Sequence, residues 1–220
     1  MSWDSVESMI KELLLAGGLS SAFVAGVMAT PVGRKRASGS TPVLTLACFS
    51  VIAAFSVAQL MIAPGLLTLL MRDVSRIGSG QPWRLATSLL VQDGGWVGAA
   101  FNLVGLLAIG TVAERALGRL RWAAIGTTSV AAAQMFAFLW QPTGAGNSVL
   151  DFGLAGAVCA ACLVKRPSRH SLIPAIVASA SFALIFAARD IHGVAGATGA
   201  LVELAFSLPA RKRGPEETVV

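Results

Sequence analysis

Charged residues are scarce in this chain. Asp, Glu, Lys and Arg make up 13% of its 220 residues, against about 25% in a typical soluble protein. Apolar residues contribute 55%, and the mean hydropathy is +0.73. So few charges cannot cover a surface that faces water, and the composition therefore excludes an ordinary soluble domain and predicts a membrane protein. One helical crossing takes about 20 apolar residues, so the chain has room for six crossings with short loops.

Cysteine and histidine are rare as well, with three and two residues. Cys48, Cys159 and Cys162 lie in apolar runs without the paired spacing of a disulfide framework or a zinc site. We expect neither a metal nor a cofactor. The first twelve residues, MSWDSVESMIKE, lack the basic lead-in of a cleaved signal peptide, so we expect this segment to be retained. The net charge of +6 comes from small basic clusters beside apolar runs, which indicates membrane topology rather than nucleic-acid binding.

Charges divide the chain into apolar segments that predict an all-α, polytopic fold. The alternation of a membrane β-barrel is absent. Residues 13–33 form a run diluted by Gly and Ser, which predicts either an additional spanning helix or an interfacial helix, with the interfacial alternative slightly preferred. We expect an N-terminal helix and basic linker (1–40), a transmembrane domain (41–210) and a cytoplasmic tail (211–220). The six predicted spans are 43–63, 94–113, 123–140, 148–164, 171–188 and 191–210.

Basic residues are unevenly distributed between alternate loops. One side carries twelve Lys and Arg residues and the other carries four, which places the richer side and the C-terminus in the cytoplasm. We expect a bacterial inner (plasma) membrane. The twelve are Arg34, Lys35, Arg36, Arg115, Arg119, Arg121, Lys165, Arg166, Arg169, Arg211, Lys212 and Arg213, and the four are Arg72, Arg76, Arg84 and Arg189.

Three polar residues are predicted at a similar membrane depth near the outer ends of three spans. Ser148 begins the fourth span, His192 begins the sixth, and Asn102 lies about two turns into the second. A serine hydroxyl becomes a good nucleophile when a neutral imidazole takes its proton, and a further donor must stabilise the oxyanion. These residues can supply the three roles. Alternatively, each one caps or bridges helices.

Small residues follow both Ser148 and His192, in the segments GNSVLDFGLAG and HGVAGATGA, and they permit close helix packing. In this ordered pattern, the chain from about residue 80 to residue 206 resembles the rhomboid family of intramembrane serine proteases. The residues that carry the resemblance are Trp83-Arg84, Asn102, Glu114 with Gly118, Gly146-x-Ser148, and His192 with Ala195 and Gly199.

The resemblance implies a six-helix rhomboid-like bundle with a Ser-His dyad below the outer membrane surface. Ser148 would be the nucleophile and His192 the general base, while Asn102 and the Ser148 backbone N–H would form the oxyanion hole. Phe152 would place its ring against the histidine, although lipid-facing or core packing is an equal alternative. Trp83-Arg84 would anchor the outer loop. The implied partners are the lipid bilayer and membrane-anchored proteins, cleaved at or near their transmembrane segments.

Three positions depart from the family pattern and favour a rival interpretation. Val149 and Ala195 replace glycines, and Gly98 stands where the family often has a histidine as a second oxyanion donor. These departures suggest a catalytically weak protease or a pseudoprotease that binds transmembrane clients.

Two acidic residues in the spans leave further alternatives. Asp151 could orient His192 as a third catalytic member, pair with Arg189 or line a wet cavity, and we rank the first alternative lowest. Glu203 is expected to make a structural hydrogen bond to another helix. A transporter or channel could instead use Asp151, Glu203 and Asn102 as a polar path.

Overall fold

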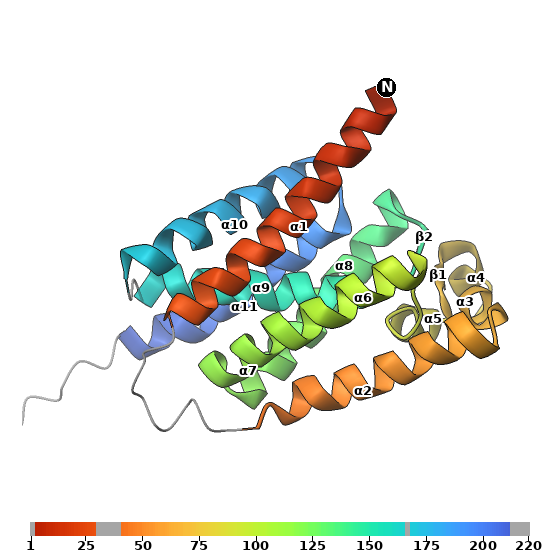
Figure 1. The fold of residues 1–220 in the computed structure, drawn as a ribbon, viewed down its shortest axis with the longest axis horizontal. Coiled ribbons are helices and arrows are strands. Elements are labelled where there is room, and N and C mark those ends of the chain that lie inside the picture. Colours follow the sequence, from red (N-terminus) through yellow and green to blue (C-terminus); the bar gives the residue numbers. More distant parts are fainter. Residues whose placement is uncertain (1–2, 30–40, 166–167, 212–220) are drawn as a thin grey trace, which may run out of the picture.

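The protein is a helical bundle in a computed structural model that describes residues 3–29, 41–165 and 168–211 (Figure 1). Within these ranges, seven helical segments are long and apolar enough to cross a membrane. Six of them confirm the predicted spans, with bounds that differ by a few residues. The seven segments are Ser5–Ala29, Val43–Ile62, Gly95–Leu117, Arg119–Trp140, Ser148–Lys165, Arg169–Ala187 and Ile191–Leu208.

Helix α9 (Ser148–Lys165) is the central element of the bundle. Its residues from Val149 to Cys162 are buried, and it packs against α1 (Trp3–Ala29), α8 (Arg119–Trp140), α10 (Arg169–Ala187) and α11 (Ile191–Arg211). Glycines face each other across the contact with α11, so the two helix backbones approach closely. A Cβ at Gly199 would overlap the backbone oxygen of Gly153, and one at Gly156 would overlap that of Gly196. The small-residue pattern therefore predicted this contact correctly.

The segment before the site is a folded connection of short elements. Helix α2 (Val43–Val57) continues into the π-helical turn η1 (Ala58–Ile62), and Pro64 begins the turn into α3 (Gly65–Leu70). Strand β1 (Arg72–Asp73), α4 (Val74–Gly78) and α5 (Arg84–Thr87) follow. Strand β1 pairs antiparallel with β2 (Thr143–Gly144), which lies in the connection between α8 and α9. This pairing brings two connections together at the end of the bundle that holds Ser148.

The buried side chain of Arg84 connects parts of that segment by hydrogen bonds. Its guanidinium donates to the carbonyl oxygens of Thr68 and Met71, at 3.0 and 2.9 Å, and to the side chain of Gln81 at 2.7 Å. The adjacent Trp83 is 51% exposed. The anchoring role of Trp83-Arg84 at a membrane interface stays a prediction.

The opposite end of the bundle contains the buried carboxylates of Glu114 and Glu203. Glu114 lies on α7 (Thr111–Leu117), which forms one span together with α6 (Gly95–Gly105) and η2 (Leu106–Gly110). On α7, Glu114 accepts hydrogen bonds from the backbone N–H groups of Leu44 and Thr45 and so stabilises the start of α2. Glu203 on α11 binds Arg121 on α8 at 3.2 Å. The prediction of a structural interhelical bond for Glu203 is confirmed.

Helix α1 lies along the bundle and contacts α10 and α9 (Figure 1). Its residues Leu19, Ala22 and Ala25 belong to the hydrophobic core. A helix that lies in the membrane plane would not pack lengthwise against two spanning helices. The structure therefore favours the spanning alternative for this segment over the interfacial one that the sequence slightly favoured. Residues 30–33 of the predicted segment and the basic cluster Arg34–Arg36 lie outside the described residues.

Candidate active site

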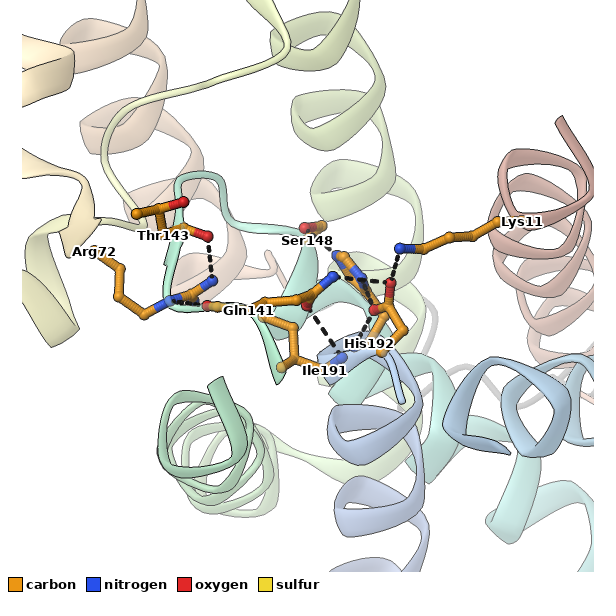
Figure 2. A network of polar contacts seen from close by, with 8 residues as sticks. Lys11, Arg72, Gln141, Thr143, Ser148, Ile191 and His192 are labelled. Atoms are coloured by element: carbon orange, nitrogen blue, oxygen red, sulfur yellow. Dashed lines mark hydrogen bonds and ion pairs between the residues drawn. The ribbon is translucent and has the colours of Figure 1, made fainter. Parts of the chain in front are cut away.

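Ser148 and His192 meet at the N-terminal ends of α9 and α11. Ser148 is the first residue of α9 and His192 the second of α11. Their side chains approach to 2.7 Å between Ser148 Oγ and His192 Nε2, as Figure 2 shows. The glycine contacts between the two helices make this distance possible. Gly146, with φ +130°, forms the turn that leads into the serine.

The pair faces a cleft of about 710 Å³. One wall comes from α1 and includes Leu13, while Val97 and Phe101 on α6 form another wall. Val97 is 83% exposed at the bundle surface, so the cleft has an apolar border on the side where α6 would face lipid. This arrangement gives an extended peptide space to reach the serine.

Asn102 lies near the serine, and its oxyanion role stays a prediction. A Cβ at Gly146 would come within 2.8 Å of Asn102 Nδ2 and 3.9 Å of Ser148 Oγ, which places both groups around this glycine. Asn102 Nδ2 donates one hydrogen to Gln92 Oε1 at 2.7 Å, and a primary amide has a second hydrogen to donate. At the start of α9, the backbone N–H groups of Leu150 and Asp151 donate to the carbonyl oxygen of Asn147, and the first N–H of the helix, that of Ser148, has no partner within the helix. Together these donors can surround an oxyanion.

Val149 and Gly98, two positions that depart from the family pattern, have different surroundings. Val149 is 4% exposed and packs in the hydrophobic core, although it also borders the cleft. Gly98 lines the cleft, and a Cβ at this position would meet no atom within 4 Å. The space that a second donor could occupy is therefore open.

Phe152 packs against the catalytic candidate pair from inside the bundle. Its ring lies 5.0 Å from the His192 ring at 61°, an edge-to-face arrangement, and it also contacts Phe182. With 1% exposure, it is buried and not lipid-facing. The predicted aromatic contact with the histidine is present, and it limits rotation of the imidazole.

The carboxylate next to His192 belongs to Asp190, a residue that the sequence patterns did not single out. Asp190 Oδ1 lies 2.5 Å from His192 Nδ1, and it also accepts the backbone N–H of His192 at 2.8 Å. Asp190 Oδ2 binds Lys11 Nζ on α1 at 2.5 Å and Gln141 Nε2 at 3.2 Å. A signal was available, because Asp-x-His at the start of a helix places an N-cap carboxylate beside the imidazole.

Asp151 was considered as the residue that orients the histidine, and the structure corrects this hypothesis. The side chain of Asp151 is 1% exposed and accepts a hydrogen bond from Asn147 Nδ2 at 3.1 Å. It faces Gly105 on α6, while His192 Nδ1 binds Asp190. The spacing of Asp151 from Ser148 did not identify its partner, because α9 is buried on all sides. Within the described ranges, no group of three or more His, Cys, Asp or Glu residues is placed to hold a metal ion.

One comparison with known proteins identifies a family for this sequence. No curated protein matches the sequence. The sequence model of the Rhomboid domain matches residues 79–213, which is more than half of the chain and includes Asn102, Ser148 and His192. Seven helices in the described part of the chain are long and apolar enough to cross a membrane, so the protein is an integral membrane protein, and it belongs to the rhomboid family.

Proposed function

We propose that this protein is an intramembrane serine protease that cleaves membrane-anchored proteins at or near their transmembrane segments. The observation that carries the proposal is the 2.7 Å contact between Ser148 Oγ and His192 Nε2 in a cleft at one end of the bundle. A hydroxyl within hydrogen-bond reach of an imidazole is the arrangement that activates serine as a nucleophile.

The chemistry follows from the positions of the two side chains. His192 Nε2 takes the hydroxyl proton while Ser148 Oγ attacks the scissile carbonyl, and the oxyanion receives hydrogen bonds from Asn102 and the start of α9. The C–N bond then breaks, and His192 returns the proton to the leaving amine. Water attacks the resulting ester by the reverse transfers, which releases the new carboxyl end and restores the serine.

The borders of the cleft support a membrane-anchored substrate. The apolar residues Val97 and Phe101 of α6 line the cleft and are also exposed, at 83% and 41%. A substrate helix in the bilayer can approach such a surface without exposing its own apolar residues to water. A segment of the substrate must unwind to bring a carbonyl to Ser148, because the amide carbonyls of an intact helix are occupied by hydrogen bonds.

The distribution of basic residues supports an orientation with the site toward the outer side of the membrane. Arg115, Arg121 and Lys165 lie at the end opposite Ser148, where the positive-inside rule expects the cytoplasm. Helix α11 also ends there, at Arg211. A bacterial inner membrane is the proposed location.

A client-binding pseudoprotease is the second candidate, and the open space at Gly98 favours it. With no side-chain donor at that position, the oxyanion has fewer stabilising groups. Removal of one oxyanion donor can reduce kcat by about 10²–10³. Such a site could still hold a transmembrane helix in the cleft.

The two candidates are separated by cleavage in proteoliposomes. Purified protein is reconstituted with single-span reporters that carry helix-breaking residues near the outer end of their transmembrane segment, and products are mapped by mass spectrometry. We expect cleavage by the wild type and none by Ser148→Ala. Products that persist with Ser148→Ala contradict the proposal, and reporter binding by both proteins without cleavage supports the pseudoprotease.

A further inference from the structure

The carboxylate of Asp190 connects His192 to a helix outside the matched Rhomboid domain. Lys11, Gln141 and His192 converge on this carboxylate, and Figure 2 shows Lys11 extending from α1 toward the Ser148–His192 pair. The Asp190 side chain is 1% exposed. A buried carboxylate with an ammonium on one oxygen and an imidazole on the other is a charge arrangement that helix packing alone does not require.

The simplest alternative is that Asp190 only caps α11. Its Oδ1 accepts the backbone N–H of His192 at 2.8 Å, which is the usual N-cap bond. Asn or Ser would serve that purpose equally well. Capping does not account for the 2.5 Å contact with His192 Nδ1 or for the recruitment of Lys11 to the other oxygen.

We propose that Asp190 is a positioning residue for His192, and that Lys11 of α1 moderates the charge of this carboxylate, so that the N-terminal helix forms part of the active site. This inference deepens the proposed protease function and rests on it. An ionised carboxylate can only accept hydrogen bonds, so Nδ1 carries the imidazole hydrogen. Nε2 is then left to accept the proton of Ser148.

The charge state of Asp190 agrees with this assignment. Burial opposes ionisation, but the bonds from His192 and Lys11 outweigh it and lower the pKa of Asp190 below its usual range. Asp190 is therefore ionised throughout the neutral range. Its stabilising contribution is fully present above the ordinary carboxyl pKa of about 3.9 and is lost as the pH falls through the lowered folded value. Protonation of Asp190 therefore does not produce an acid limb of activity near neutral pH.

The charged groups around His192 come from several elements, and the Asp190 carboxylate and the Lys11 ammonium bound to it have opposite effects. The Asp190 carboxylate favours the imidazolium, whereas the Lys11 ammonium disfavours it. Substitutions of these two residues should shift the acid limb in opposite directions, which a purely structural role would not do. Other charged groups that line the same cleft are Glu12 on α1, Arg72 on β1 and Asp93 before α6.

The first test reads the histidine directly and does not require activity. The sequence has two histidines, and His170 is exposed at the other end of the bundle. In protein labelled with ¹⁵N-histidine, the variant His170→Gln assigns the His192 signals. We expect neutral His192 to carry its hydrogen on Nδ1 in the wild type. A predominant Nε2–H form would overturn the proposal, even in a protein without protease activity.

The second test compares pH profiles of three variants. Asp190→Asn retains the cap and removes the charge, and it should lower the acid limb by about 1 pH unit or more and reduce kcat by up to about 10⁴-fold. Lys11→Met should raise the limb by a smaller amount, because the lysine side chain is 40% exposed. Asp73→Asn is the matched control, since Asp73 caps α4 and does not contact His192. It should leave the limb in place.

The double variant Lys11→Met with Asp190→Asn excludes a packing artefact. In the single variant Asp190→Asn, the new side-chain amide could direct an N–H toward the Lys11 ammonium, and removal of both charges relieves that conflict. We expect this double variant to fold as the wild type does and to keep an acid limb below the wild-type value. If both single variants have wild-type limbs and wild-type ¹⁵N titration midpoints, the proposal is wrong while the protease function stands. If the wild type is inactive, the ¹⁵N titrations alone decide the proposal.

Discussion

The two sides of the α9 helix that meet α11 and α1 are built differently. Toward α11, added Cβ atoms at Gly156 and Gly199 would overlap main-chain oxygens. Toward α1, an added Cβ at Gly26 would meet side-chain atoms of Val158 on α9 and of Val112 on α7, whereas one at Gly17 would meet nothing within 4 Å. Main chain cannot move aside as a side chain can. The α9–α11 contact therefore sets the Ser148–His192 distance rigidly. Helix α1 contributes the charge of Lys11, and its packing contacts involve side chains that can rearrange.

The largest effect should come from Gly199→Ala. The new Cβ would overlap the backbone oxygen of Gly153, so the helices must separate, and we expect a loss of about 3 kcal/mol or more in the free energy of unfolding. Gly17→Ala is the matched control in open space, where better helix propensity should stabilise α1 by about 0.5–1 kcal/mol. Thermal unfolding in detergent measures both, and equal effects of the two substitutions would contradict the comparison.

Next in size is the effect of Asn102→Ala on turnover. Loss of one oxyanion donor should reduce kcat by about 10²–10³. Because Asn102 acts in the transition state, KM should change little. Thermal unfolding checks that the fold survives the loss of the bond to Gln92. A variant that raises KM and keeps the wild-type kcat would assign Asn102 to substrate binding instead.

A smaller effect is expected from Arg84→Met, which tests the connection above the site. This change leaves the carbonyl oxygens of Thr68 and Met71 without their guanidinium donor. We expect a cost of about 1–3 kcal/mol, and faster hydrogen exchange confined to α3 and β1. Uniformly faster exchange, α9 and α11 included, would show that this connection is not a separate region.

The α9–α11 contact could be predicted from the sequence because its cause is local. Gly and Ala recur at helical spacing after Ser148 and His192, and the apolar runs have the length of membrane spans. The order of polar residues along the chain placed Ser148, His192 and Asn102 at one depth. These features need only helix geometry and the thickness of a bilayer. The contact between the Phe152 ring and the histidine was implied by the family resemblance, because spacing alone left lipid-facing or core packing as equal alternatives.

The contacts of α1 could not be predicted from the sequence, because they depend on tertiary packing between distant segments. Asp190 lies in a turn where Arg189 adopts a φ of +57°, so helix periodicity does not give its direction. Lys11 contacts this carboxylate from the first helix of the chain, far away in the sequence. Asp151, three residues after the serine, was the more visible carboxylate. The packing of α1 against α10 likewise depends on a partner that composition does not identify.

Fluorophosphonate labelling tests the central claim most directly. Purified wild type, Ser148→Ala and His192→Ala are labelled in detergent, and the modified residue is located by mass spectrometry. The account predicts modification of Ser148 in the wild type, none in Ser148→Ala and almost none in His192→Ala. Folded wild-type protein that is not labelled, or labelling of His192→Ala at the wild-type rate, would contradict an activated serine at this site.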